Sequence, residues 1–570
     1  MRHSSLALVL TTSLVTTACA GLQRHAPAAA ATQVGDVIVV EVPAIVHPAD
    51  ETAAWWFRNG AAQAAARGAM AGRAKNVILF VGDGMSLTTV AAARILEGQR
   101  KGNSGEENRL AWEDFHATAL SRTYNTNAQT PDSAGTATAL TTGIKTRMGV
   151  LGIGPGAERS DCAQALAGRA LTLWELASAS GMATGVVTTT RVTHATPAAT
   201  FSHSADRNWE GDANLPDAAK AAGCIDIARQ LIESPYGNGL DVVMGGGRKY
   251  FMPEHQFDPE YAQVTGKRSD GRDLIKDWQQ RHPRGSYVWN ARQLAAAPRD
   301  QPLLGLFEPD HMQYEHDRPQ DPAGEPSLAD MTQAAINRLS ANPNGFVLMV
   351  EGGRIDHAHH AGNAYRALDE TIAMSDAVRA AAELTSADDT LIVVTADHSH
   401  TLSFVGYPAR GNPILGKVMG GSGEDGDPAH FARDATGLPY TTLSYSNGPG
   451  YAGATSQQPE GPKSFEHSAK GFQAARNGRP DLTSVDTEAP DYLQEALLPT
   501  RSETHGGDDV GIWASGPGSS AVRGSVEQNT IFHFLLQASP RLRYALCAKG
   551  DCDANGVPVT LPRPTASGFE

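Results

Sequence analysis

A short apolar segment that ends at a polar residue recurs along this chain, and this repeat constrains the fold more than any other feature. The first occupies residues 76–81 (NVILFV) and ends at Gly82-Asp83-Gly84, and a helix-like segment, 89–96, follows at once. Further apolar segments occupy 183–190, 346–350, 390–395 and 510–514, with helical stretches at 163–180, 218–233, 328–340 and 364–384. Alternating strands and helices predict an α/β sandwich with a mostly parallel central sheet.

Polar residues stand at the ends of these apolar segments. Glu351 follows 346–350, Asp397 and His398 follow 390–395, and His505 precedes 510–514. In open parallel sheets, ligands bind beyond the carboxyl ends of the strands. We therefore expect these side chains to meet at one edge of the sheet.

The segment 351–360 (EGGRIDHAHH) has the spacing of a metal site. Asp356 and His360 are four residues apart, so on a helix they share a face and can hold one ion. Imidazole and carboxylate ligands together suit zinc, and a catalytic zinc usually has about three protein ligands and one open position. The alternative, an exposed charged surface, explains poorly why a strongly apolar strand should end here.

Two ligand sets can be assembled from these residues. They are Asp356, His360 and His505 in one set, and Asp83, Asp397 and His398 in the other. Two neighbouring metal ions can hold the attacking and leaving oxygens of an in-line phosphoryl displacement. Taken alone, Asp83 would more often be a turn residue or a helix cap.

Ser133 lies in a run of small residues, 131–139 (PDSAGTATA), that predicts a turn leading into a helix. Backbone N–H groups at a helix N-terminus can hold an anion, although such a serine is usually only a cap. No G-x-S-x-G elbow surrounds it. A serine-histidine-aspartate triad is not needed if zinc lowers the pKa of the hydroxyl.

The composition limits the class of partner. The chain has 570 residues, enough for one large domain, and a formal net charge of −15. An acidic surface argues against a nucleic-acid-binding role, which needs a basic stripe. An anionic substrate stays compatible with this charge, because bound metal ions reverse its sign locally.

Residues 1–19 predict an export signal, in which Arg2 precedes an apolar run, 6–17, too short to span a bilayer. Ala18-Cys19-Ala20 fits ordinary signal peptidase, whereas residues 16–19 (TTAC) resemble a bacterial lipobox in which Cys19 is lipidated. The predicted location is the periplasm, the outer membrane as a lipoprotein, or the cell surface. Residues 20–48 are interpreted as a tether, and 556–570 as a polar tail.

Without Cys19 the chain has four cysteines, and an oxidising compartment favours two disulfides among them. They are Cys162, Cys224, Cys547 and Cys552. Spacing alone allows three pairings. A zinc site made of the four cysteines is the alternative, but the chain has no C-x-x-C pair.

The stretch from about 406 to 499 is rich in Gly, Pro, Ser and Asp and has weak periodicity. It interrupts the fold between Asp397-His398 and His505. So long a structureless loop is unusual inside a core. We therefore predict an inserted subdomain or a long surface excursion.

Several of these segments, in this order, closely resemble alkaline phosphatase, with details of its animal-type branch. They are 81–85 (VGDGM), 131–139, 186–198 (VVTTTRVTHATPA), 351–360, 394–400 (VTADHSH) and 503–510 (ETHGGDDV). The resemblance runs from about residue 50 to 552 and implies a three-layer α/β sandwich over 49–555. The insertion corresponds to the family's crown.

The resemblance implies a role for each site residue. Ser133 would attack the phosphate of a phosphate monoester and become phosphorylated, and Arg207 would grip two phosphate oxygens, a bidentate task that suits a guanidinium. The zinc set of Asp83, Asp397 and His398 would activate the serine, and the set of Asp356, His360 and His505 would stabilise the leaving oxygen. Magnesium would be held by Asp83, Thr196 and Glu351.

His194 and His357 stand where the enterobacterial type has aspartate and lysine. His194 would lie in the outer shell of the magnesium site and His357 near the phosphate, so we expect both to orient other groups rather than to bind metal. A neutral imidazole in place of aspartate removes negative charge near magnesium.

The resemblance also suggests a peripheral calcium ion, since hard oxygen ligands suit calcium. Glu260, Glu308, Glu325 and the carbonyl of Phe307 would be its ligands. Glu325 stands where an aspartate is usual, and two extra residues precede it. The alternative is a group of surface carboxylates without an ion.

The animal-type branch further implies that Cys162 pairs with Cys224 and Cys547 with Cys552. The helix containing Trp55-Trp56-Phe57 matches an arm that grips a partner subunit, so we expect a homodimer. The predicted activity is hydrolysis of many phosphate monoesters with an alkaline optimum. A phosphodiesterase, a sulfatase and a binding protein without turnover are the alternatives, and the C-x-P-x-R segment of sulfatases is absent.

Overall fold

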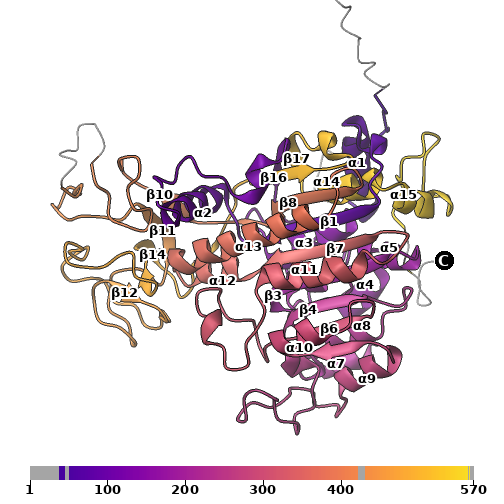
Figure 1. Ribbon diagram of the computed structural model, residues 1–570, viewed down its shortest axis with the longest axis horizontal. Helices are drawn as coiled ribbons and strands as arrows, with labels where there is room; N and C mark the ends of the chain where they lie inside the picture. Colours follow the sequence, from indigo (N-terminus) through magenta and orange to yellow (C-terminus); the bar gives the residue numbers. More distant parts are fainter. Residues whose placement is uncertain (1–36, 45–49, 421–429, 563, 565–570) are drawn as a thin grey trace, which may run out of the picture. The chain divides into compact units, whose positions relative to one another are not determined.

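The computed structural model describes residues 37–44, 50–420, 430–562 and 564. The predicted export segment with Cys19, most of the tether and the last residues of the tail lie outside this described part. From Ile38 onward the chain forms one compact unit, drawn in Figure 1. No described helix is long and apolar enough to cross a membrane.

A ten-stranded sheet lies at the centre of this unit (Figure 1). From one edge to the other its strands are β17 (Gly524–Glu527), β2 (Ala117–Arg122), β16 (Val510–Ser515), β8 (Thr390–Ala396), β1 (Asn76–Gly82), β7 (Phe346–Gly352), β3 (Ala183–Arg191), β4 (Val242–Gly246), β6 (Leu303–Leu306) and β5 (Ser286–Val288). Among these described strands, β16 alone runs antiparallel to its neighbours. The α/β prediction with a mostly parallel sheet is therefore confirmed.

The central strands are buried on both faces, which is why they read as continuous apolar segments. All residues of β1, β7 and β8 are buried. Alternate residues of β1 enter two separate cores: Val77 and Leu79 enter one, and Ile78 and Phe80 the other. The period of two along a strand divides the apolar side chains between the two faces.

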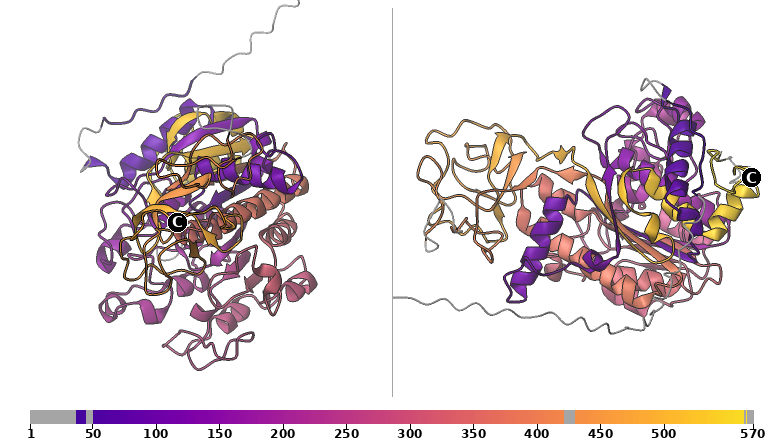
Figure 2. Two further views of the ribbon diagram at one scale, coloured as in Figure 1. Left: turned by 90° about the vertical axis from the view of Figure 1, so that its left-hand side faces the viewer. Right: turned by 90° about the horizontal axis from the view of Figure 1, so that it is seen from above.

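Helices cover both faces and complete three layers (Figure 2, right). On one face lie α1 (Ala53–Ala66), α3 (Ser133–Thr142), α5 (Leu173–Ala179), α6 (Ala195–Ala198), α8 (Ile227–Ile232), α9 (Leu274–Arg281), α14 (Thr530–Ala538) and α15 (Pro540–Cys547). On the other lie α2 (Leu87–Arg100), α10 (Ala291–Ala296), α11 (Leu328–Leu339), α12 (Arg354–His360) and α13 (Ala364–Leu384).

Two predicted helices are wrong as single elements. The stretch 163–180 divides into α4 (Cys162–Ala167) and α5, because Gly168 ends the first and Thr172 caps the second in a capping box with Glu175. The stretch 218–233 divides into α7 (Asp217–Ala221) and α8. Gly223, at φ +92°, separates them, a conformation that glycine adopts without steric cost.

Five strands of the sheet were not predicted. They are β2, β4, β5, β6 and β17, which have three to six residues each. Strands β4, β6 and β17 contain glycine, β2 alternates buried and exposed positions, and β5 has only three residues. For these reasons no continuous apolar segment marks any of the five in the sequence. Their place in the sheet depends on neighbouring strands rather than on local sequence.

Strand register explains why distant polar residues meet. Gly82 of β1 pairs with Gly352 of β7 and with Ala396 of β8, so the three strands end side by side. Because β16 is antiparallel, its first residues lie at the same edge as the end of β8. His505, which precedes β16, therefore approaches His398 from the opposite chain direction.

The segment predicted as an insertion leaves and returns through a two-stranded stem. β9 (Ser399–His400) pairs with β15 (His505–Gly506), and His400 lies opposite His505. Between them, β10 (Leu402–Phe404), β11 (Leu443–Gly448) and β14 (Ala496–Pro499) form a small sheet. β12 (Lys463–Ser464) pairs with β13 (Tyr492–Leu493). The described part of 406–499 is therefore not a structureless loop.

Two disulfides join the cysteines in the pairing that the resemblance implies. Cys162 at the start of α4 is bonded to Cys224 ahead of α8, and Cys547 at the end of α15 is bonded to Cys552. The cysteines of the first disulfide are 62 residues apart in the sequence, and those of the second are 5 residues apart.

These separations predict unequal stabilities. By the loop-entropy relation, removing Cys162–Cys224 should lower the free energy of unfolding by about 4 kcal/mol, and removing Cys547–Cys552 by about 2 kcal/mol. Urea unfolding of the metal-loaded double Cys→Ala variants measures both. A larger loss from the Cys547–Cys552 pair would contradict the loop-length argument.

Candidate active site

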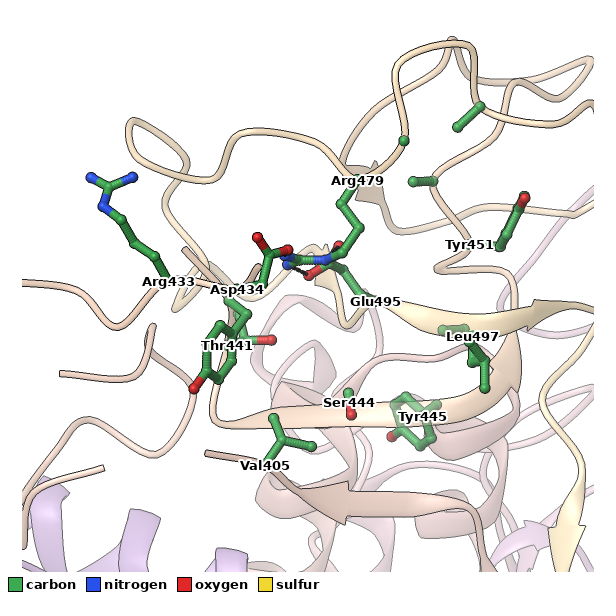
Figure 3. Close-up of a pocket in the computed structure, with 15 residues that line it drawn as sticks. Val405, Arg433, Asp434, Thr441, Ser444, Tyr445, Tyr451, Arg479, Glu495 and Leu497 are labelled. Atoms are coloured by element: carbon green, nitrogen blue, oxygen red, sulfur yellow. Dashed lines mark hydrogen bonds and ion pairs between the residues drawn. The ribbon is translucent and has the colours of Figure 1, made fainter. Parts of the chain in front are cut away.

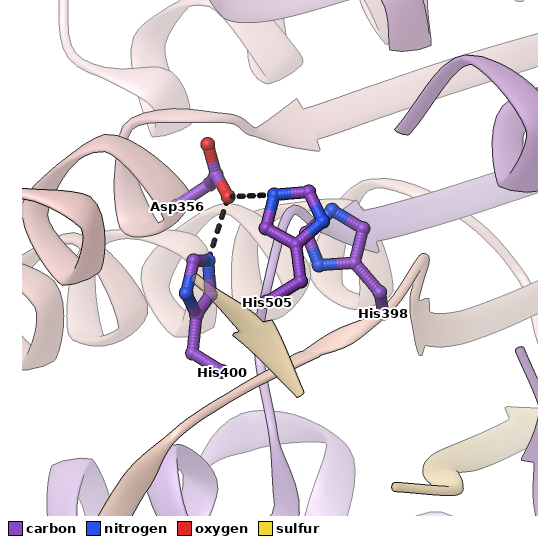
Figure 4. Close-up of side chains that lie close together, drawn as sticks. All are labelled: Asp356, His398, His400 and His505. Carbon is purple, nitrogen blue, oxygen red and sulfur yellow. Dashed lines mark hydrogen bonds and ion pairs between the residues drawn. The ribbon is translucent and has the colours of Figure 1, made fainter. Parts of the chain in front are cut away.

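The residues expected at the strand ends come together beyond β1, β7 and β8. Asp356 and His360 lie on α12 after β7, Asp397 and His398 follow β8, and His505 lies in the stem. Figure 4 shows Asp356, His398 and His505 close together, with His400 and His505 both directed at the same oxygen of Asp356.

The first set has the geometry of a metal site. His360 Nε2 lies 3.1 Å from His505 Nε2, and both lie 3.3 to 3.4 Å from Asp356 Oδ1. Ligand bonds of 2.0–2.1 Å around a tetrahedral zinc would separate the ligand atoms by about 3.3 Å. The residues therefore fit zinc.

The second set is equally compact. His398 Nε2 lies 3.3 Å from Asp83 Oδ1 and 3.3 Å from Asp397 Oδ2. Both oxygens of Asp83 are buried and have no hydrogen-bond partner among the described residues. An ion would supply the missing partner, since buried carboxylates are otherwise paired.

The three histidines share an arrangement typical of metal ligands. Each directs Nδ1 at a backbone carbonyl: His360 at that of Glu503 (2.6 Å), His505 at that of Pro131 (2.8 Å) and His398 at that of Ser399 (3.2 Å). These contacts assign the proton to Nδ1. The Nε2 lone pair of each ring then faces the carboxylates and is available to a metal.

Ser133 begins helix α3 and faces the second set. Its Oγ lies 3.1 Å from His398 Nε2, and the residue is 2% exposed. The helix cap is Asp132, which accepts a hydrogen bond from the backbone N–H of Gly135. Ser133 is thus not needed as a cap, and its hydroxyl lies beside candidate metal ligands.

Arg207 contacts Asp132, the residue that precedes this serine. Its Nη1 lies 3.1 Å from Asp132 Oδ2, and its Nη2 lies 3.1 Å from His194 Nε2. Asp132 also accepts from the backbone N–H of Gly149. One carboxylate therefore orients both the helix that begins at Ser133 and the guanidinium of Arg207.

The oxygen atoms predicted to hold magnesium are buried and partly unsatisfied. Thr196 Oγ1 and Glu351 Oε1 have no partner among the described residues, as for Asp83. Burial raises the pKa of Glu351 to about 7 and, together with Asp397, Asp356 and Glu351, raises that of Asp83 well above its usual value. Three hard oxygen donors without partners fit magnesium.

His194 lies beside this set of oxygen atoms. One of its ring nitrogens lies within 4.8 Å of carboxylate oxygens of both Asp83 and Glu351. Its Nε2 faces Arg207, and its Nδ1 is buried without a partner among the described residues. His194 thus links the oxygen cluster to the arginine.

A third imidazole, His311, was missed by the sequence reasoning. Its ring centroid lies 4.2 Å from that of His357 and 5.3 Å from that of His194. Its Nδ1 accepts from the backbone N–H of Arg191 at 3.2 Å. It comes from the loop after β6, where no local pattern marks it.

His400 and Glu503 form a second missed pair. His400 Nε2 lies 2.6 Å from Asp356 Oδ1, and its Nδ1 bonds the carboxylate of Glu503. Burial alone would lower the pKa of His400, but the two carboxylates raise it to about 10. The ring has a carboxylate at each nitrogen and so orients Asp356, and it lies in one group of possible metal ligands with Asp356, His398 and His505. The segment VTADHSH contains His400, but its spacing does not reveal this role.

Two of the predicted calcium ligands, Glu260 and Glu308, lie together with one residue that was not predicted. Oxygens of Glu260, Glu308 and Asp321 lie within 4.8 Å of one another, and Asp321 was not predicted. Glu325 is 4% exposed, and burial together with Glu308 and Asp321 raises its pKa to about 10. Phe307, whose carbonyl was expected as a ligand, directly precedes Glu308 in the chain, and its side chain is buried.

These features define the class of the protein. A parallel α/β sandwich presents two carboxylate–imidazole sets at its strand ends, with a serine at a helix N-terminus and an arginine beside them. That arrangement is typical of a metal-dependent hydrolase acting on phosphate esters.

The comparisons with known proteins agree with this class. A family model described as alkaline phosphatase matches residues 74–540. Tissue-nonspecific alkaline phosphatase of Rattus norvegicus is 44% identical over 474 residues, 82% of this chain and 84% of that protein. Alkaline phosphatase of Gadus morhua is 43% identical over 474 residues, 82% and 92% of the two chains.

Solved structures share the fold. The alkaline phosphatase of Thermus thermophilus has a TM-score of 0.57 at 25% identity, covering 82% of this chain and 92% of that one. That of the Antarctic bacterium TAB5 has a TM-score of 0.52 at 22% identity, covering 82% and 98%. This chain belongs to the alkaline phosphatase family and to its animal-type branch. It is a phosphatase whose substrates are phosphate monoesters.

The pair His400–Glu503 generates a prediction about metal affinity. Glu503→Gln removes the charge that holds His400 protonated against Asp356. Loss of such an outer partner should weaken zinc binding about 10- to 100-fold. Competition with a zinc chelator on the purified protein measures this.

Glu383→Gln is the matched control, because Glu383 is exposed on α13. It should bind zinc like the parent. Equal zinc affinity in Glu503→Gln and Glu383→Gln would show that the pair does not support the metal site.

Proposed function

We propose that this protein hydrolyses a broad range of phosphate monoesters, with an alkaline optimum, through a covalent phosphoserine at Ser133 and with two zinc ions and one magnesium ion. One observation carries the proposal. Ser133 Oγ lies 3.1 Å from His398 Nε2, beside candidate metal ligands.

Two ligand sets would hold zinc, and an all-oxygen set would hold magnesium. The zinc sets are Asp83, Asp397 and His398, and Asp356, His360 and His505. The magnesium set is Asp83, Thr196 and Glu351, so Asp83 would lie between two ions. When bound, the ions supply positive charge that favours the serine alkoxide and offsets charge on the leaving oxygen.

The chain's own residues perform the remaining work. Arg207 grips two phosphate oxygens, and its bond to Asp132 keeps the guanidinium aimed at Ser133. The first N–H groups of α3 hold the phosphate at the helix N-terminus. Ser133 Oγ forms a bond to phosphorus as the ester oxygen–phosphorus bond breaks, and the alcohol leaves. Water then attacks the phosphoserine, which frees inorganic phosphate and restores the hydroxyl.

His194 and His357 would orient groups rather than react. His194 Nε2 faces the Arg207 guanidinium, and the His357 ring lies 5.5 Å from that of His194. Burial, with nearby arginine and histidine side chains, lowers the pKa of both rings well below the usual value. Neutral imidazoles leave the positive charge of Arg207 available to the phosphate.

Replacement of the nucleophile tests the mechanism. Ser133→Ala should reduce kcat for p-nitrophenyl phosphate by roughly 10³-fold or more, because no covalent intermediate can form. The parent should hydrolyse p-nitrophenyl phosphate far faster than bis(p-nitrophenyl) phosphate, and chelation should abolish turnover. Steady-state kinetics on one preparation measures all three.

Ser160→Ala is a suitable control, since Ser160 is an exposed serine that contacts Asp206. It should keep the parent rate. Undiminished turnover in Ser133→Ala would exclude the phosphoserine, and preference for the bis ester would indicate a phosphodiesterase.

We further propose a peripheral calcium ion held by Glu260, Glu308, Glu325 and the carbonyl of Phe307, with Asp321 as an added ligand. Several carboxylates close together and partly buried need a cation. Arg248 bonds Glu260 at 3.1 Å, and its other side-chain ion pair is with Asp258, outside this group of carboxylates.

Stability should depend on calcium more strongly as pH rises. Without the ion, burial with neighbouring carboxylates raises the pKa of Glu308 to about 8 and of Glu325 to about 10, from 4.5. When folding raises the pKa of an acid, the free energy of unfolding of the protein falls as pH increases from the unfolded-state pKa to the folded-state pKa. The rise in Tm on adding calcium should therefore grow between about pH 7 and pH 10, as calorimetry can measure.

Glu325→Gln should flatten this dependence, because the amide does not ionise. A calcium effect that is the same at both pH values, or unchanged in Glu325→Gln, would contradict the site.

The remaining expectations concern location and assembly, and we propose them on the sequence alone. Residues 1–19 would direct export and Cys19 could carry a lipid, with 20–48 as a tether to a domain over 49–555 that includes the crown at 406–499. The family resemblance of the Trp55-Trp56-Phe57 helix supports a homodimer. The acidic charge supports the absence of a nucleic-acid-binding role.

A further inference from the structure

One side chain of the insertion reaches into the helix that carries two candidate zinc ligands. Tyr445 belongs to β11, and its hydroxyl lies 2.7 Å from Nδ1 of His359 on α12. Tyr445 is 2% exposed and His359 0%. A buried contact between two polar groups is thus made across the boundary of the insertion.

The other nitrogen of His359 continues the contact. Its Nε2 lies 3.0 Å from Oγ1 of Thr89, on α2. Thr89 in turn bonds the hydroxyl of Ser86 through both its Oγ1 (2.9 Å) and its backbone N–H (3.0 Å). Ser86 caps α2 only three residues after Asp83. A buried chain of hydrogen bonds therefore joins β11, α12 and the Asp83 loop.

His359 sits where it controls the orientation of α12. It lies between Asp356 and His360, which share one face of the helix. Its two ring nitrogens are held by hydroxyls from two different elements, so rotation of α12 about its axis would break one of them. Its ring also lies 4.9 Å from that of His400, which bonds Asp356.

The position of Tyr445 is set by the insertion itself. It pairs with Leu402 of β10 and Ala496 of β14, in the middle strand of the small sheet. Ser444, the preceding residue, lines a cavity of about 710 Å³ together with Tyr445, Tyr451 and Leu497 (Figure 3). Salt bridges from Arg479 to Asp434 and Glu495 close the opposite wall.

We propose that Tyr445 is a positioning residue, by which the insertion fixes α12 and the Asp83 loop relative to each other and so sets how firmly metal is held. It touches neither the phosphate site nor a metal ligand and acts through His359. The inference rests on the proposed function in so far as Asp356, His360 and Asp83 bind zinc.

Zinc release from the intact metal-loaded protein tests this without reference to activity. Tyr445→Phe removes one hydroxyl and keeps the ring. It should release zinc to a chromogenic chelator about 10-fold faster or more, the size expected for an outer partner. Excess zinc should restore the lost fraction of turnover, which simple misfolding would not allow.

Tyr451→Phe is the matched control. Tyr451 lines the same cavity, but its ring packs against Phe472 within the insertion. This variant should release zinc at the parent rate. Thr89→Val interrupts the same hydrogen-bond chain from the other end, and it should also accelerate release even if Tyr445→Phe does not fold.

Parent-like zinc release in both Tyr445→Phe and Thr89→Val would overturn the inference and leave the proposed function intact. Equal acceleration in Tyr451→Phe would also overturn it, because the effect would then come from the cavity and not from the hydrogen bond. A parent protein that retains no zinc would instead overturn the proposed function, and the inference with it.

Discussion

Buried negative charge at one edge of the sheet is the constraint on which the rest of the structure depends. Asp83, Glu351, Asp356 and Asp397 are 0 to 4% exposed and lie at or just beyond the ends of three adjacent parallel strands. Carboxylates in such a place repel one another and lose hydration, which is costly unless cations or donors compensate. The sandwich supplies the burial, and the histidines, arginines and proposed metals supply the compensation.

That constraint accounts for the division of labour among the histidines. Three rings keep the lone pair of Nε2 directed at the carboxylates, because Nδ1 of each donates a hydrogen bond to a backbone carbonyl. They are His360, His398 and His505. His400 has carboxylates on both sides and therefore carries a proton on each nitrogen. Chemically identical rings are thus suited to bind metal or to orient a neighbouring carboxylate according to what each Nδ1 faces.

Much of this site could be predicted because its residues follow long apolar strands or share a helix face. Asp397 and Glu351 are marked by β8 and β7, and Asp356 and His360 by helical spacing. His311, Glu503 and Asp321 could not be predicted in this way, because they lie in loops whose position depends on the folded chain. The short strands β4, β5 and β6 were not predicted for a similar reason, because pairing with neighbouring strands rather than their own sequence determines their position.

The insertion is part of the site and not only an addition to it. Its stem, β9 with β15, sets His400 opposite His505, so the same two strands that open the excursion complete the first ligand set. Tyr445 then ties the small sheet to α12.

The central claim is that the strand ends form two adjacent zinc sites around Ser133. Anomalous difference maps collected on crystals of the purified protein, on either side of the zinc absorption edge, test it most directly. The account predicts two zinc peaks, one among Asp356, His360 and His505 and one among Asp83, Asp397 and His398 next to Ser133. A single peak, or zinc bound to His400 instead, would contradict it.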